Sequence, residues 1–110
     1  MDRVRTNSSY PDGGIVDVFV KHGDQVVLTD LGETLGWVRL RSQDATRSDE
    51  QQRILRDICA ADNVQLVNGQ LVLRCYDKNL LLHCVMRLGE AAASVALALS
   101  KPTELDGGGE

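Results

Sequence analysis

The stretch Leu28-Thr29-Asp30-Leu31-Gly32-Glu33-Thr34 stands where a predicted β-hairpin ends and a predicted helix begins. Upstream, residues 15–20 alternate between two faces with the period of a strand, and residues 26–29 form a second β-branched run. Gly23 lies between these two runs and suits a turn. The acidic and hydroxyl residues that close the stretch can cap a short helix. The sequence therefore predicts a hairpin followed directly by a helix.

Residues 64–75 predict a second hairpin. Asn68 and Gly69 both tolerate positive φ, as a type I′ turn requires, and alternating apolar runs flank them. Pairing of Val67 with Gln70 across this turn fixes the register of the two strands. The face predicted to join the core then carries Val64, Leu66, Leu71, Leu73 and Cys75.

Two further helices are predicted from their caps and their apolar spacing. Ser48 and Gln51 form a capping box at the start of a helix that Asn63 ends. A single long helix is expected from Asp77, as its N-cap, to Ser100. The polar segment 41–47 has no periodicity and predicts a loop.

The predicted order of elements is ββααββα, which indicates an α+β fold. Two β-hairpins would form an antiparallel sheet, packed by helices on one face. With 110 residues, of which 43% are apolar, the chain has the size of a single domain. We expect one α+β domain over residues 1–101 and a disordered tail over residues 102–110.

The arrangement of a Gly-led hairpin, an L-T-D-x-G-x-T turn, a helix, an N-G hairpin and a closing helix resembles a small prokaryotic and phage domain family of unknown function. The matching residues are Gly14, Asp17, Leu28, Thr29, Asp30, Gly32, Thr34, Asn68, Gly69 and Leu71. The resemblance covers about residues 6–99. Leu31 stands where an acidic residue is common in that family, so a paired-carboxylate site there would lack one member. The resemblance implies a bacterial or phage origin and an intracellular setting, and it implies no activity.

Composition limits the classes of function. A net charge of −4 argues against nucleic-acid binding through the whole surface, although a local basic patch remains open. Cys59, Cys75 and Cys84 lack CxxC spacing and indicate free thiols in a reducing cytoplasm. The uncharged run 91–100 is much shorter than the roughly 18 apolar residues of a membrane span, so no membrane association is expected.

Four carboxylates gather near the first predicted hairpin, at Asp17, Asp24, Asp30 and Glu33. They could hold a divalent metal. Turn chemistry explains Asp24 and Asp30 more simply, because short Asx side chains stabilise turns. Asp17 lies between apolar residues on a strand, and a hydrogen-bonded structural role is favoured for it. We therefore expect no metal site, while a role beyond structure stays open for Asp17, Asp30 and Glu33.

An arginine-rich segment follows the first predicted helix and is the predicted partner-binding site. Its members are Arg39, Arg41, Arg47, Arg53 and Arg56. Such a cluster can grip phosphate or an acidic partner. Acidic residues at positions 44, 49, 50 and 57 nearly cancel its charge, so a solvated mixed face is the alternative.

The closing helix is apolar nearly all round over residues 91–99, and one sheet face cannot cover every side of it. This predicts a homodimer in which two such helices pair, with Gly89 among the small residues that allow close approach. The predicted interface residues are Ala92, Val95, Ala96, Leu97 and Leu99. In the alternative, the short helix around Trp37 covers the second side.

Taken together, the sequence favours a non-catalytic, cytoplasmic protein-binding module of bacterial or phage origin. One form would be a counter-defence inhibitor of the anti-CRISPR type, since a small acidic chain suits occlusion of a basic nucleic-acid channel. Its partner would then be a protein, such as a nucleic-acid-binding defence complex, and direct nucleic-acid binding is not expected. The alternatives are a nucleic-acid or nucleotide-handling accessory protein that uses the arginine segment, and a metal enzyme at the first hairpin. Without a Gly-rich phosphate loop, a catalytic triad or an HExxH motif, neither enzymatic activity nor a cofactor is expected.

Overall fold

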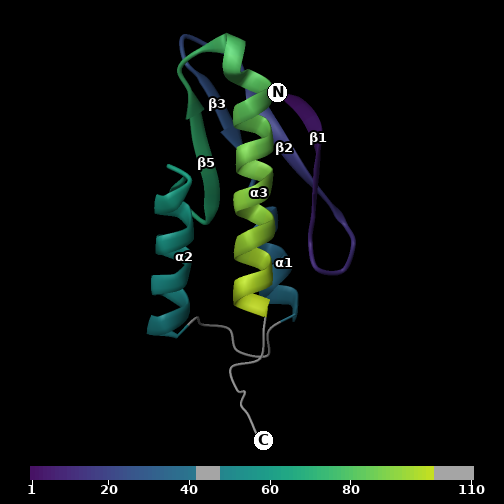
Figure 1. Cartoon of the computed structure of the whole chain (residues 1–110), viewed down its shortest axis with the longest axis vertical. Coiled ribbons are helices and arrows are strands. Elements are labelled where there is room, and N and C mark those ends of the chain that lie inside the picture. The colour runs from purple at the N-terminus through teal and green to yellow at the C-terminus, as the bar shows by residue number, and fades with distance from the viewer. Residues whose placement is uncertain (42–47, 101–110) are drawn as a thin grey trace, which may run out of the picture.

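The structure is a computed structural model that describes residues 1–41 and 48–100. Within these residues the strands form one antiparallel sheet in the order β1-β2-β3-β5-β4 (Figure 1). The elements in chain order are β1 (Asp2–Ser9), β2 (Ile15–Lys21), β3 (Val26–Thr29), α1 (Glu33–Arg41), α2 (Asp49–Ala61), β4 (Gln65–Val67), β5 (Gln70–Cys75), the 3-10 turn η1 (Lys78–Leu80) and α3 (Leu81–Ser100). The α+β class is confirmed.

The order βββααββα differs from the prediction because strand β1 precedes the first predicted hairpin. β1 has the sequence DRVRTNSS, in which Val4 is the only apolar residue, so no apolar alternation marks it as a strand. Its partners are instead backbone groups of β2, with Val4 opposite Val18 and Arg5 opposite Asp17. At the edge of the sheet, where β1 lies, polar side chains are ordinary.

The turn chemistry predicted for the second hairpin is confirmed. Asn68 and Gly69 have φ values of 51° and 79°, and Val67 pairs with Gln70. Leu71 on β5 is fully buried, but its cross-strand partner Leu66 stays 41% exposed. β4 is the edge strand next to β5, so its side chains lie at the rim of the core.

Gly69→Val should therefore lower the free energy of unfolding by about 1 kcal/mol or more, because a β-branched residue strongly disfavours positive φ. A thermal melt of the variant beside the wild type measures the loss. An unchanged melting midpoint would contradict the type I′ assignment.

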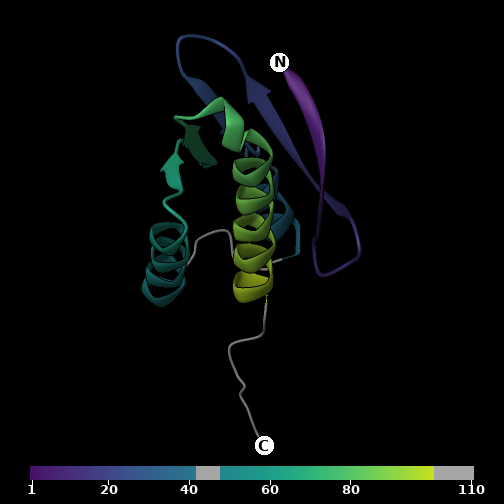
Figure 2. The same cartoon turned by 45° about the horizontal axis from the view of Figure 1, so that its top comes forward.

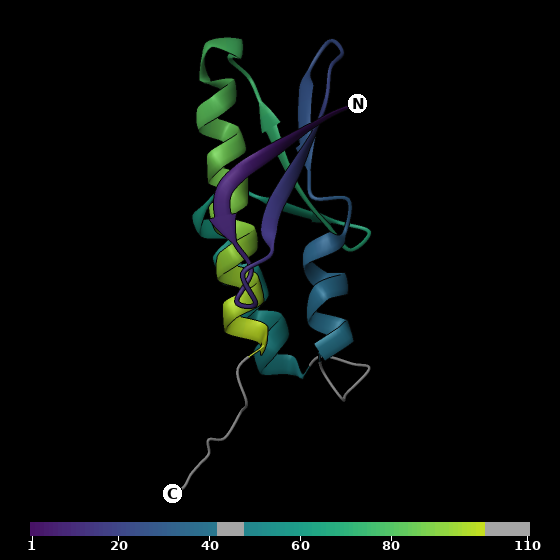
Figure 3. The ribbon, with the colours of Figure 1, turned by 90° about the vertical axis from the view of Figure 1, so that its right-hand side faces the viewer.

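Helix α3 lies along one face of the sheet and continues past the ends of the strands (Figures 1 and 3). Its N-terminal half covers the strands, and its C-terminal half faces α1, which lies below β3 in Figure 3. α2 packs beside α3 on another side (Figures 1 and 2). The strand residues that face α3 and fill the core include Val16, Val18, Val20, Val26, Leu28, Leu71 and Leu73.

By length and composition alone, Lys78–Ser100 could cross a membrane. Here the helix has the packing of a core helix, since Val85, Leu88 and Val95 are at most 2% exposed within the chain itself. The sequence argument against a membrane span measured only the uncharged run 91–100, although the predicted helix itself reached from Asp77 to Ser100.

The chain itself covers most of the predicted dimer interface, so these residues are not open to a second chain in this structure, and the dimer itself stays a prediction. Ala92, Val95, Ala96 and Leu99 are at most 3% exposed, and only Leu97 remains accessible at 50%. The alternative explanation is the one that the structure supports, since α1 packs against α3. A dimer through the four buried residues would require the core of each chain to open.

The helix ends follow the predicted local chemistry. The Ser48 side chain accepts from the Gln51 amide and the Gln51 side chain accepts from the Ser48 amide, which completes the capping box of α2. Asn63 has a φ of 57° just after α2. Asp77 caps η1 rather than α3 directly, so a 3-10 turn precedes the long helix. The predicted tail 102–110, and the predicted loop beyond Arg41 as far as residue 47, lie outside the described residues.

Candidate functional site

A surface hollow of about 530 Å³ lies over the outer side of α1. We call this region the α1 surface, and it is formed by Tyr10, Glu33, Gly36, Trp37, Arg39 and Leu40. Tyr10 comes from the loop between β1 and β2, and the other members belong to α1. The hollow therefore joins two segments that are far apart in the sequence.

The α1 surface arises from helical spacing. Glu33, Gly36, Trp37 and Leu40 follow the i, i+3, i+4, i+7 pattern of one helix face, while Leu35 and its neighbours on the other face are buried in the core. Leu40 is 84% exposed, the highest value among the exposed large apolar side chains of the described residues. Nothing lies within 4 Å of a β-carbon built on Gly36, so this glycine leaves open space on the helix. An exposed apolar side chain next to open space can receive a partner.

Trp37, which lines this hollow, is held in place by three contacts. Its ring stacks on Tyr10, with centroids 5.5 Å apart and an interplanar angle of 13°. The Arg41 guanidinium lies 4.0 Å from the ring centroid, and Nε1 of the indole donates to Asp12 at 3.1 Å. Tyr10 is fixed in turn by a 3.2 Å hydrogen bond between its hydroxyl and that of Thr34. A site fixed in advance loses little conformational entropy when it binds.

Asp12 and Glu33 give this region its electrostatic character. Hydrogen bonds from the Gly14 amide and the Trp37 indole, together with the charge of Arg41, lower the pKa of Asp12. Asp12 therefore stays ionised and holds Arg41 through a 2.6 Å contact. Burial and the nearby carboxylates raise the pKa of Glu33. The carboxylate of Asp12 is thus occupied by Gly14, Trp37 and Arg41. Glu33 is the acidic residue that borders the hollow.

The structure divides the predicted arginine site. Arg39 lines the α1 surface, and Arg41 is engaged by Asp12 and Trp37. Arg53 and Arg56 are exposed on α2, which lies on a different side of α3 from α1 (Figures 1 and 3). Arg47 lies outside the described residues. The four described arginines therefore do not form one continuous patch.

The carboxylates predicted near the first hairpin serve different contacts, although burial, and then the charges of Asp17 and Asp30, raise the pKa of Glu33. Asp30 is fully buried and accepts hydrogen bonds from backbone amides, which supports a structural role in the turn. Asp17 pairs with Arg3 and lies near Arg5 on the sheet face away from α3. Asp24 is exposed in the turn between β2 and β3. Among the described residues, no three His, Cys, Asp or Glu side chains come together in a way that could hold a metal ion.

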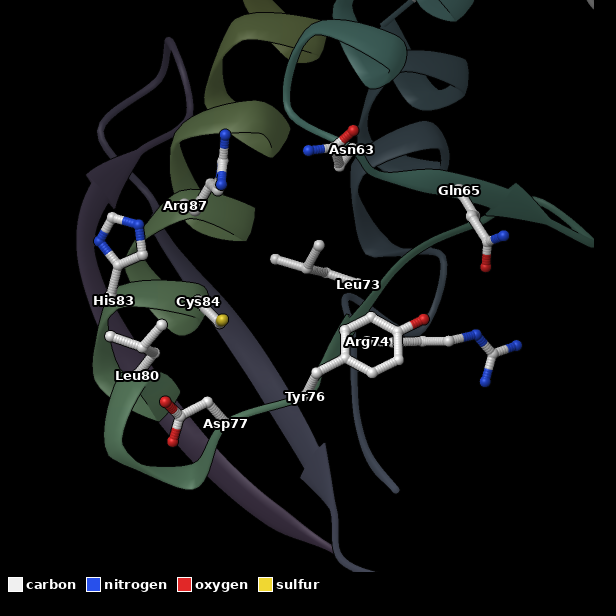
Figure 4. A pocket seen from close by; sticks show the side chains of 10 residues that line it. All are labelled: Asn63, Gln65, Leu73, Arg74, Tyr76, Asp77, Leu80, His83, Cys84 and Arg87. Carbon is white, nitrogen blue, oxygen red and sulfur yellow. The ribbon is translucent and has the colours of Figure 1, made fainter. Parts of the chain in front are cut away.

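A second hollow of about 500 Å³ lies between β5 and the start of α3 (Figure 4). Leu73 and Cys84 point into it, whereas the guanidinium of Arg74 and the imidazole of His83 lie at opposite sides and point apart. Burial, and then the neighbouring Cys75, raise the pKa of the Cys84 thiol. His83 and Cys84 diverge as neighbours on a helix must. This hollow has an apolar floor and a scattered polar rim, and its side chains form no nucleophile and base pair.

Sequence reasoning named Arg39 and Glu33 but missed the other members of the α1 surface. Two signals in the sequence could have indicated it. Gly36 lowers the stability of the helix by about 1 kcal/mol relative to Ala, and Leu40 does not share the helix face of the buried residues Leu35 and Val38. The contribution of Tyr10 could not be found this way, because it depends on the loop folding back onto α1.

A comparison with models of protein families matches residues 6–95 to the family described as "Domain of unknown function DUF1828". No curated protein and no solved structure matches the chain. The match spans most of the chain, from the middle of β1 into the C-terminal half of α3.

Proposed function

The chain belongs to the DUF1828 family, whose description assigns no activity, and we propose that it is a non-catalytic module that binds a protein partner through the α1 surface. The observation that carries this proposal is Leu40, a leucine left 84% exposed beside a rigid tryptophan. Tryptophan, tyrosine and arginine are the residues enriched at the centres of protein interfaces, and Trp37, Tyr10 and Arg39 line the same hollow as this leucine.

The charge of the α1 surface suits a partner with both an apolar and an acidic group. Leu40 and the edge of Trp37 would contact the apolar group, and Arg39 offers a guanidinium that no described residue pairs. Glu33 on the same helix face disfavours a second acidic group at the other end of the hollow. The surface therefore carries a basic group and an acidic group at different places. This difference would favour one orientation of the partner and is a basis for specificity.

A bacterial or phage origin and an intracellular setting belong to this proposal, as the resemblance implies. An inhibitor of a host defence complex is one form that it could take. The net charge of −4 supports that form, since an acidic chain is attracted to a basic channel. The alternative accessory protein, which would use all five arginines together, has less support because the four described ones divide between α1 and α2.

The test compares two double variants for binding to one partner. The first variant, Leu40→Ser with Arg39→Ser, alters the α1 surface, and the control, Arg53→Ser with Arg56→Ser, alters only α2. Tagged wild type retains partners from a bacterial lysate, mass spectrometry identifies them, and the purified partner is then titrated against each variant. We expect the α1 variant to bind about tenfold or more weakly and the α2 control to bind as the wild type does.

Both pairs change exposed side chains, so circular dichroism should show the same fold for each. Full binding by the α1 variant, or an equal loss in the α2 control, would contradict a partner site on α1.

A further inference from the structure

The face of the sheet away from α3 carries no helix among the described residues (Figure 3). The outer face is made by the strand side chains that alternate away from α3. They are Arg3 and Arg5 of β1, Ile15, Asp17, Phe19 and Lys21 of β2, Val27 and Thr29 of β3, Gln70, Val72 and Arg74 of β5, and Gln65 and Val67 of β4. We call this face the outer sheet face. An antiparallel sheet can leave one face to water, and such a face is then usually polar throughout.

The charge on the outer sheet face is opposite to that of the chain. Its strands carry four basic side chains, at Arg3, Arg5, Lys21 and Arg74, and a single carboxylate, at Asp17. The whole chain has a net charge of −4. Four of the twelve basic residues therefore lie on these strands beside one carboxylate, which gives the face a local positive surplus, and a charge argument based on the whole surface does not apply to it.

Asp17 holds two of these arginines in position. Its Oδ2 atom accepts from Arg3 Nε at 3.0 Å and lies 2.8 Å from Arg3 Nη2, while its Oδ1 atom is 3.7 Å from Arg5 Nε. The carboxylate is nearly buried, yet the side chains of Arg3 and Arg5 are 57% and 68% exposed. Asp17 thus neutralises one charge and leaves both guanidinium groups facing solvent.

An aromatic ring lies among these cations. Phe19 is half-buried, pairs across the sheet with Arg3, and is two residues from Lys21 on the same strand face. Lys21, Val27 and Arg74 form the neighbouring row across β2, β3 and β5, at strand spacings of about 4.8 Å. The ring is therefore flanked by cations along the strand and across it.

We propose that the outer sheet face binds single-stranded nucleic acid. Arg3, Arg5, Lys21 and Arg74 would contact the phosphates, and one base would stack on Phe19. Flat basic surfaces with an aromatic side chain bind single strands in this way, because every base has a face that can stack. A second copy of this chain would place like charges against each other, which disfavours pairing of two such faces.

The test titrates a fluorescent oligodeoxythymidine of about ten nucleotides into the full chain and follows its anisotropy at two salt concentrations. Lys21→Ala with Arg74→Ala removes two charges from the outer sheet face, and Arg53→Ala with Arg56→Ala removes the same two charges from α2. We expect the first pair to weaken binding by about tenfold and to reduce the salt dependence, and the control pair to have little effect. Phe19→Leu keeps an apolar side chain and should weaken binding by about fivefold or more through loss of stacking.

Three results would overturn the proposal: no binding of the oligonucleotide by the wild type, an equal loss in both charge pairs, or binding of an acidic poly-glutamate peptide as tight as that of the oligonucleotide with no effect of Phe19→Leu. The last result would mean a general surface for acidic peptides. Circular dichroism checks the fold of Phe19→Leu, and the exposed Lys21 and Arg74 provide the test if that variant unfolds.

Discussion

Asp30→Ala should lower the free energy of unfolding by about 3–5 kcal/mol, because three backbone amides lose a charged acceptor in the interior. Asp30 is fully buried, and its Oδ1 atom accepts from Gly32 at 2.8 Å and from Leu71 at 2.9 Å. Its Oδ2 atom accepts from Thr34 at 3.1 Å. One carboxylate therefore ends β3, caps α1 and joins both to β5.

Chemical denaturation of Asp30→Ala, Asp30→Asn and a control measures this effect. Asparagine keeps one acceptor oxygen but turns a donor group toward an amide, so an intermediate loss is expected for it. The control is Asp24→Ala, which changes an exposed turn aspartate on the same hairpin and should stay within about 0.5 kcal/mol of the wild type. A loss below about 1 kcal/mol for Asp30→Ala would refute this account of the turn.

Gly89→Ala should destabilise the protein by about 2 kcal/mol, although alanine is the better helix former. A β-carbon at Gly89 would lie 2.8 Å from Cγ2 of Thr6 and 2.9 Å from its Oγ1. Thr6 cannot easily move away, since its hydroxyl donates to the Val16 carbonyl at 2.9 Å and accepts from the Ser8 amide at 3.0 Å. The small residue expected to serve helix pairing between two chains instead allows α3 to approach β1.

Gly36→Ala is the matched control, because it also replaces a helical glycine by alanine. A β-carbon at Gly36 would meet nothing within 4 Å, so we expect this variant to be more stable by up to about 1 kcal/mol. Thr6→Ala removes two of the clashing atoms, and the double variant with Gly89→Ala should lose less stability than the two single variants added together. Equal effects of alanine at the two glycines would show that helix propensity, and not contact with β1, decides the result.

Local chemistry in the sequence determined the turns and helix caps of this protein. The positive φ values at Asn68 and Gly69 and the capping box of Ser48 with Gln51 each involve residues within a few positions of one another. Such features depend on backbone sterics and short-range hydrogen bonds, which the residue types alone can specify. Strand β1 was missed because it depends on no such local signal. Its partners are backbone groups of another strand.

The candidate sites depend on the tertiary structure to a much greater extent. The sequence identified Arg39 and Arg41, but the α1 surface also needs Tyr10 and Asp12, which reach α1 from a loop more than 20 residues earlier. The outer sheet face likewise places Arg3 of β1 and Arg74 of β5 on one surface. No periodicity within a single segment encodes these neighbours.

The apolar surface of α3 shows most clearly what the sequence determined and what the tertiary structure determined. The sequence determined that Val95 and Leu99 must be covered on more than one side, because an apolar helix surface left in water is unfavourable. It could not determine what covers them, since hydrophobic burial has no direction and a second chain would satisfy it as well as α1 does. The tertiary structure covers them from within the chain, because α1 and α2 pack against α3 and leave only Leu97 half exposed among the predicted interface residues.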